Sequence, residues 1–391
     1  MIENRERLRN LADAINTAIE RRLCFYAYAF KSEIDFGACR KPLRGLHRGG
    51  FVIAPFDNNP DKIMTIMPEK SEKSEKSEKS ELSELSGESE LSGLIRILLI
   101  NPDNSDSPDN SDSPDSFPAL STPRESHAAL VRDAKASLKS LDEKIVCSRV
   151  AIGEAAIDIG ATFLSLHSKD PNAFTFCFFT PATDIYIGAS PEVLLRKDGQ
   201  QFHTMALAGT KDITDTTPWD IKNIKEHNVV IKYILSVMEA NGIKTHYGKT
   251  QDRIAGNVAH LYTPIDGVPA NESEGIDIEV LLNDLSPTPA LCGFPKRKAL
   301  DIIRDREDYS RGYYGGYCGP VEANGDFRLF VNLRSARVTV PDADGISRYA
   351  IFAGGGINRM SDPDEEWIET EKKMTTIRRC LVAREKGKET S

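Results

Sequence analysis

Hydrophobic and polar positions recur with two different periods along the chain, and together they predict a mixture of helices and strands. Apolar residues at helical spacing predict helices over 5–22, 125–140, 218–241, 275–284, 295–305 and 363–383. Apolar runs rich in aromatic and β-branched residues predict strands within 23–30, 49–57, 144–153, 173–180, 184–210, 326–340 and 347–357. The strands cluster without regular strand–helix alternation, which favours an α+β domain with stacked sheets over a doubly wound parallel fold.

The pattern breaks down between residues 66 and 120. Residues 69–93 read EKSEKSEKSEKSELSELSGESELSG and residues 103–116 read DNSDSPDNSDSPDS, a polar tract that cannot bury enough apolar surface to offset its ordering cost. We predict a disordered insertion at 66–120 between an N-terminal part, 1–65, and a core, 121–385, of one large domain. The apolar run LIRILLI at 94–100 is either a short strand or an exposed patch. The aspartates are read as solvated charge rather than a calcium site.

Composition and charge narrow the class of protein. The 391 residues are 40% hydrophobic, enough for a core, and carry a formal net charge of −9 without a basic stripe, which argues against a nucleic-acid partner. The seven cysteines are scattered and lack C-x-x-C spacing, which argues against a disulfide framework and a zinc site. We see no signal peptide and no run long enough to span a bilayer, so we expect a soluble, cytoplasmic protein with no membrane contact.

The segment DEEWIETEKK at 364–373 is the most acidic stretch outside the insertion. On a helix, Glu366 and Glu369 share a face, and Lys373 lies one turn further along it. By itself such a segment is most simply a solvated helix with an ion pair. The next candidates change that interpretation.

Two further charged residues stand in apolar surroundings. Arg334 lies within the predicted strand FVNLRSARV, where a charge is either buried with a partner or faces a cleft. Glu192 starts another apolar strand, and Glu226 lies just before the apolar part of a predicted helix. Separated carboxylates without a Cys or His cluster suit Mg²⁺, which often bridges to an anionic substrate group. The residues alone therefore predict a magnesium-dependent enzyme acting on a small polyanion, with Arg334 gripping a carboxylate.

Ten short segments, in order, resemble the chorismate-utilising enzymes. This family includes isochorismate synthase, salicylate synthase, and component I of anthranilate synthase and of aminodeoxychorismate synthase. The resemblance covers roughly 121–380, and its segments are KIVCSR, GASPEVLLRKDG, ALAGT, KEHNVV, VAHLYTPIDG, PTPALCGFP, RGYYGGYCG, FVNLRSA, AGGGI and DEEWIETEKK. It implies a four-layer α/β/β/α fold, a site between the sheets, bound Mg²⁺, chorismate as the small-molecule substrate and a monomeric enzyme.

The resemblance also implies roles for individual residues. Glu226 and Glu369 match the direct metal ligands, and Glu366 matches a carboxylate that binds the metal directly or through water. Arg334 and Lys373 match contacts to the substrate's anionic groups. The AGGGI segment is expected to bring backbone N–H groups close to the substrate. The full set of implied substrate contacts is Thr210, Tyr314, Arg334, Gly355 and Lys373.

Within the family, the resemblance is strongest to isochorismate synthase. Lys144 matches its general base, which activates water, where ammonia-using relatives typically have glutamine. Glu192 matches the general acid that protonates the departing 4-hydroxyl, which requires a carboxyl kept protonated by an apolar setting. Ala208 stands where aminodeoxychorismate synthase carries a nucleophilic lysine, and Ala290 where anthranilate synthases tend to have threonine.

Three alternatives stay open at this point. Salicylate synthase also uses a lysine base and then eliminates pyruvate from isochorismate. An enzyme like anthranilate synthase component I is a second alternative. The third is an inactive relative whose insertion serves as an interaction module, although all the matching catalytic residues are present. Isochorismate feeds both menaquinone and siderophore biosynthesis, and the sequence does not separate these pathways.

Overall fold

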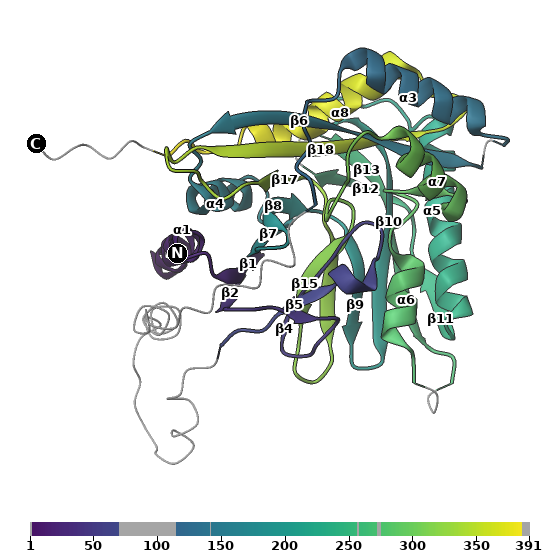
Figure 1. The fold of residues 1–391 in the computed structure, drawn as a ribbon. Helices are drawn as coiled ribbons and strands as arrows, with labels where there is room; N and C mark the ends of the chain where they lie inside the picture. The colour runs from purple at the N-terminus through teal and green to yellow at the C-terminus, as the bar shows by residue number, and fades with distance from the viewer. Residues whose placement is uncertain (1, 70–114, 141, 256–257, 272–274, 385–391) are drawn as a thin grey trace, which may run out of the picture.

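The computed structural model describes residues 2–69, 115–140, 142–255, 258–271 and 275–384, and within them two antiparallel sheets lie face to face (Figure 1). The first sheet has eight strands, in the order β14 (Gly293–Phe294), β6 (Lys144–Ala155), β18 (Ser347–Ile357), β17 (Ser335–Val338), β8 (Asp184–Ser190), β7 (Phe174–Thr180), β1 (Cys24–Phe30) and β2 (Glu33–Cys39). The second has ten, β11 (Ile243–Tyr247), β13 (Val258–Pro269), β10 (Gln201–Asp212), β9 (Val193–Asp198), β16 (Phe327–Val331), β15 (Tyr317–Val321), β4 (Gly50–Ala54), β5 (Met64–Ile66) and β3 (Leu43–Arg44), with β12 (Gln251–Ala255) beside β13.

Helices cover the outer faces of both sheets. The first sheet carries α1 (Ile2–Glu20), α3 (Arg124–Ser137), α4 (Ile159–Lys169) and α8 (Pro363–Arg378). The second sheet carries α5 (Ile221–Ala240), with α6 (Ile278–Leu285) packed beside it. Helix α7 (Lys296–Arg306) packs at the edge formed by β14 and β6, and a short 3₁₀ helix, η1 (Pro60–Lys62), precedes β5. The predicted α+β fold with four α/β/β/α layers is confirmed (Figure 1).

Strand β1 illustrates why the sequence folds this way. Its residues CFYAYAF form an uninterrupted apolar run because both faces of the strand are buried. Tyr26 and Tyr28 point into the core between the sheets, and Phe25, Ala27 and Ala29 point to the core under the helices. Between the sheets the ring of Phe174 stacks on that of Phe330, with centroids 4.0 Å apart, so the inner core joins both sheets.

The two helices that carry the acidic residues begin at defined caps. The side chain of Asp220 accepts a hydrogen bond from the amide of Asn223 at the start of α5. Asp362 caps α8 in the same way, followed by Pro363 at the first helical position. Helix α8 ends at Arg378, earlier than predicted, because residues 382–384 turn away and hydrogen-bond to residues 156–158.

The predicted insertion lies mostly outside the described residues, and so does its apolar run 94–100. Its flanks are described. Ile66 is buried in β5, and Asp115 pairs with Lys62 at the other end. Phe117 lies under the guanidinium groups of Arg337 and Arg348.

All seven cysteines are buried free thiols. Across the part of the chain that the structure describes, no helix has the length and apolar character needed to cross a membrane.

Candidate active site

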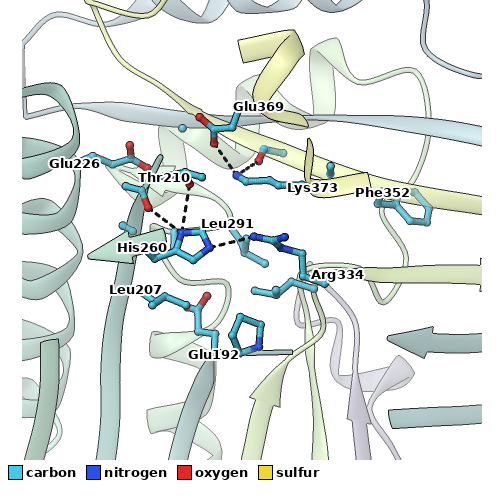
Figure 2. Close-up of a pocket in the computed structure, with 18 of the residues that line it drawn as sticks. Glu192, Leu207, Thr210, Glu226, His260, Leu291, Arg334, Phe352, Glu369 and Lys373 are labelled. Carbon is cyan, nitrogen blue, oxygen red and sulfur yellow. Dashed lines mark hydrogen bonds and ion pairs between the residues drawn. The ribbon is translucent and has the colours of Figure 1, made fainter. Parts of the chain in front are cut away.

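A pocket between the two sheets gathers most of the residues singled out from the sequence. Seven of the predicted site residues line it, from both sheets and from both covering helices: Glu192, Thr210, Glu226, Tyr314, Arg334, Glu369 and Lys373. Figure 2 shows Glu192 at one end of the pocket, Glu369 and Lys373 at the other, and His260 with Arg334 between them. We call these the Glu192 end and the Glu369 end. The predicted residues Lys144, Gly355 and Glu366 lie behind the pocket wall rather than on it.

Two crossovers between the sheets place Glu192 and Arg334. The chain leaves β8 of the first sheet and enters β9 of the second through Pro191 and Glu192. It returns from β16 of the second sheet to β17 of the first through residues 332–334. The crossovers are bonded to neighbouring strands, since the amide of Val331 donates to the carbonyl of Glu192 (3.0 Å) and that of Ala189 to the carbonyl of Arg334 (3.2 Å).

The prediction that Arg334 lies within a strand was therefore wrong. It lies where the chain changes sheets, and its φ of +51° is in the left-handed region that non-glycine residues rarely adopt. The chain passes close to β8 at this point, where a Cβ on Gly188 would lie 2.8 Å from the carbonyl oxygen of Arg334. A costly backbone conformation at a pocket residue indicates a functional constraint.

The Arg334 guanidinium is buried and held by a neutral histidine. Its Nη2 donates to Nε2 of His260 at 3.0 Å, and Nδ1 of His260 lies 2.8 Å from the carbonyl oxygen of Gly209. Burial, and then the positive charge of Arg334, lowers the pKa of His260 to about 3, so Nδ1 carries the proton and donates it to Gly209. Among the described residues no carboxylate forms an ion pair with Arg334, so this buried cation is set to receive an anion.

The Glu192 end holds a carboxyl group in a dry setting. The side chain is 3% exposed, and burial raises its pKa to about 8. The positive charge of Lys144 only partly opposes this shift. Glu192 is therefore protonated at neutral pH and can donate a proton.

The three glycines of AGGGI lie inside β18, not in a turn, and two of them make room for carboxylates. A Cβ on Gly355 would lie 2.6 Å from Oε2 of Glu366, and one on Gly356 would lie 2.3 Å from Oε1 of Glu226. Gly354 and Gly356 line the pocket, whereas Gly355, the predicted substrate contact, lies against Glu366. Glycine is therefore required at positions 355 and 356 mainly because two glutamates lie so close to the strand.

Lys144 begins β6, as predicted, and reaches the pocket through Glu226. Its side chain is 2% exposed, and its Nζ donates to Oε1 of Glu226 at 2.8 Å. Glu226 itself lines the pocket from α5. This ion pair connects the first sheet to the helix that covers the second.

Glu366 and Glu369 share one face of α8, as their spacing predicted, but they differ in position. Glu369 lines the pocket, and the predicted pair with Lys373 forms at 2.7 Å, while Lys373 also donates to the carbonyl of Gly354. Glu366 is 1% exposed and bonds through Oε1 to Lys222 of α5 at 2.7 Å. Burial, then repulsion from Glu369, raises the pKa of Glu366 to about 7. Burial also disfavours the charge of Glu369, but the Lys373 ammonium keeps its pKa below the ordinary value.

The residues of the Glu369 end fit a hard divalent cation. Glu226 and Glu369 supply carboxylate oxygens at the wall, and Oε2 of Glu366 is buried without a hydrogen-bond partner. Within the described ranges no three acidic, His or Cys side chains form a cage around one point. Mg²⁺ does not require one, because it usually takes one or two carboxylates and completes its shell with water and substrate oxygens.

Two residues of the site were not identified from the sequence. His260 lies in the quoted segment VAHLYTPIDG, but 258–269 was not predicted as a strand, so nothing placed its ring between Gly209 and Arg334. Lys222 lies one helical turn before Glu226, a spacing that would have indicated a cation near the acidic cluster.

Comparison with known proteins shows which family of enzymes this chain resembles. The family described as chorismate binding enzyme matches residues 89–382. The isochorismate synthase EntC of Escherichia coli K12 is 30% identical over 250 residues, which span 60% of this chain and 61% of EntC. The isochorismate synthase MenF of Bacillus subtilis is 32% identical over 201 residues, 48% of this chain and 41% of that protein.

Solved structures share the fold at lower identity. The menaquinone-specific isochorismate synthase MenF of Escherichia coli matches with a TM-score of 0.71 at 18% identity, covering 96% of this chain and 91% of that one. Anthranilate synthase component I of Streptococcus pneumoniae matches with a TM-score of 0.58 at 18% identity, covering 90% and 89%. The fold is thus common to enzymes with different names. With the family match over three quarters of its length, this chain belongs to the chorismate-binding enzymes.

Proposed function

We propose that the protein is a magnesium-dependent isochorismate synthase, which converts chorismate to isochorismate by adding water at C2 and releasing the 4-hydroxyl as water. The observation that carries this proposal is the pairing of opposite chemistries in one pocket. A protonated Glu192 lies at one end, and Glu226, which carries the ion pair with Lys144, lines the same pocket. Relatives at about 30% identity carry the name isochorismate synthase, which supports the same assignment.

Chorismate carries two carboxylates, and the pocket offers separate cations for them. Arg334 has a guanidinium fork oriented by His260 and paired with no carboxylate among the described residues, which suits bidentate recognition of one carboxylate. Lys373, fixed by Glu369 and the Gly354 carbonyl, supplies a second positive charge. Thr210 and Tyr314 complete the lining. When bound, Mg²⁺ would neutralise a substrate carboxylate at the Glu369 end, held by Glu226 and Glu369 with Glu366 close behind.

The proposed reaction requires Lys144 to release the proton of its ion pair first; it then takes a proton from water, and the water oxygen bonds to C2 of the ring. The ring double bond shifts, the C4–O bond breaks, and Glu192 gives its proton to the departing hydroxyl. One water enters and one leaves, so chorismate and isochorismate are isomers. The high pKa of Glu192 suits it to be the donor, because a carboxyl ionised at neutral pH has no proton to give.

Two alternative products stay open for the same pocket. Salicylate synthase would add elimination of pyruvate after the shared first step. An anthranilate-type activity would use ammonia, which the position of Lys144 does not favour. Ala208 lines the pocket and has no amine, which speaks against the covalent route of aminodeoxychorismate synthase. A role as an inactive interaction module is the least supported, because the proposed acid and anion contacts line one pocket and the proposed base bonds to Glu226 in its wall.

The test is product analysis. Purified protein is incubated with chorismate, with and without Mg²⁺, and the products are separated by chromatography. Isochorismate formed only with metal is the expected result. Salicylate with pyruvate would reassign the protein to salicylate synthase, and anthranilate formed only with ammonia would overturn the role of Lys144. The monomeric state, the cytoplasmic location and the choice between menaquinone and siderophore pathways stay predictions.

A further inference from the structure

The Lys222–Glu366 ion pair links the two helices that carry the wall carboxylates. Lys222 lies one turn before Glu226 on α5, and Glu366 lies one turn before Glu369 on α8. Helix α5 packs on β10 and β13 of the second sheet, whereas α8 packs on β18 of the first. The 2.7 Å contact therefore joins the covering helix of one sheet to that of the other, next to the pocket.

The pair also determines which oxygen of the Glu366 carboxylate is left without a hydrogen bond. Lys222 binds Oε1, and this leaves Oε2 buried without a hydrogen-bond partner beside Gly355. The two side chains are only 17% and 1% exposed, so water screens the contact weakly. By contrast Lys372 and Asp212, which also join α8 to the second sheet, are 45% and 35% exposed.

We propose that Lys222 is a positioning residue for the metal, whose bond to Glu366 fixes the separation of Glu226 and Glu369 and keeps the second oxygen of Glu366 available. The inference rests on the proposed function, in that it takes the Glu369 end as the magnesium site. Lys222 does not line the pocket but bonds to Glu366, so it would act through that residue. A cation beside a metal site would ordinarily weaken metal binding by repulsion. Removing Lys222 should therefore lower the magnesium affinity if the residue positions Glu366, and raise the affinity if the residue only repels the metal.

The experiment titrates Mg²⁺ into the full chain by calorimetry, without chorismate and well below the unfolding temperature. Lys222→Met is expected to lower the magnesium affinity about tenfold or more, in the range seen when groups that orient metal ligands are removed. Lys222→Arg, which keeps the charge and the bond, should restore most of the affinity. The matched control is Lys372→Met, which removes the same charge from an exposed pair and should change the affinity about twofold or less.

Equal or tighter magnesium binding by Lys222→Met would overturn the inference, because it would make Lys222 a mere competing charge. If that variant does not fold, Lys222→Gln replaces it, since its neutral hydrogen bond to Glu366 is weaker and a drop in affinity is again expected. A wild-type protein that binds no magnesium would overturn the metal part of the proposed function and this inference together. Failure to form isochorismate, with magnesium binding lost in Lys222→Met, would overturn the product assignment alone.

Discussion

The two ends of the pocket hold the same residue type in opposite protonation states. Glu192 has no ion-pair partner among the described residues and is buried at a crossover, so its pKa rises to about 8. Glu369 is buried as well, but Lys373 one turn away keeps its pKa below the ordinary value. The main difference is the ion pair with Lys373, and it suits Glu192 to the proposed role of proton donor and Glu369 to the proposed role of metal ligand.

The largest effect is expected at Lys144, the proposed base, which pairs with Glu226 of the pocket wall. Lys144→Ala should lower kcat about a thousandfold or more, since a general base contributes 10²–10⁴-fold, while the fold is kept. Product formation by chromatography and a circular dichroism spectrum would check both statements. Turnover near the wild-type rate would remove Lys144 from the role of base.

Glu192→Gln tests the proton-donor end. It should lower kcat about a hundredfold and leave the magnesium titration unchanged. In the wild-type protein the proton on Glu192 is present below pH 8 and lost above it, so the rate should fall as pH rises through about 8. The variant should lack this fall. A pH profile shared by the two proteins would contradict the assignment.

Glu369→Gln tests the other end, with the reverse pattern. Magnesium affinity should drop about ten- to a hundredfold, and the fall in rate near pH 8 should persist. Calorimetry with Mg²⁺, alongside the pH profile, separates the two ends. An unchanged magnesium titration would place Glu369 outside the metal shell.

Gly356→Ala tests whether the strand must leave space for Glu226. The new methyl group would fall 2.3 Å from Oε1 of that residue, so the carboxylate must move, and we expect about a tenfold loss of kcat/KM. Gly275→Ala is the control, because its Cβ would meet no atom within 4 Å. Equal activity in the two variants would mean that β18 shifts to accommodate the methyl group and that Glu226 does not need the space left by Gly356.

The smallest effect is expected from the insertion. Replacing residues 70–114 by a short Gly/Ser linker should leave kcat within about threefold, because long insertions in surface loops are well tolerated. The flanking residues Ile66 and Phe117 stay in place, since both make contacts in the described structure. A large loss in steady-state turnover would tie the insertion to the site.

Much of this arrangement was predictable because it depends on short spacings. The shared face of Glu366 and Glu369, the pair with Lys373 and the start of β6 at Lys144 all follow from helical or strand periodicity. The resemblance supplied the fold and the order of the segments.

Other features depend on contacts that no local pattern contains. The crossover at Arg334 has apolar strands on both sides, so it reads as one continuous strand. Strand β13, with Pro264 and Gly267 inside it, lacks a strand signal, and its His260 was missed with it. Helix α4 was also not predicted, although Asp158 caps it. The partner of Glu366 became visible only in the folded structure, where Lys222 of α5 reaches it from the helix that covers the other sheet.

The paired crossovers have a consequence for how molecules enter and leave. The chain passes from one sheet to the other twice beside the pocket. These covalent connections prevent the two sheets from separating there by a hinge motion. Substrate and product must therefore enter and leave through the open edge of the pocket. The amides of Ala189 and Val331, which bond across the crossovers, should exchange with solvent only on global unfolding. Strong protection of these two amides from hydrogen exchange would show that the crossovers between the sheets are among the slowest-opening parts of the fold.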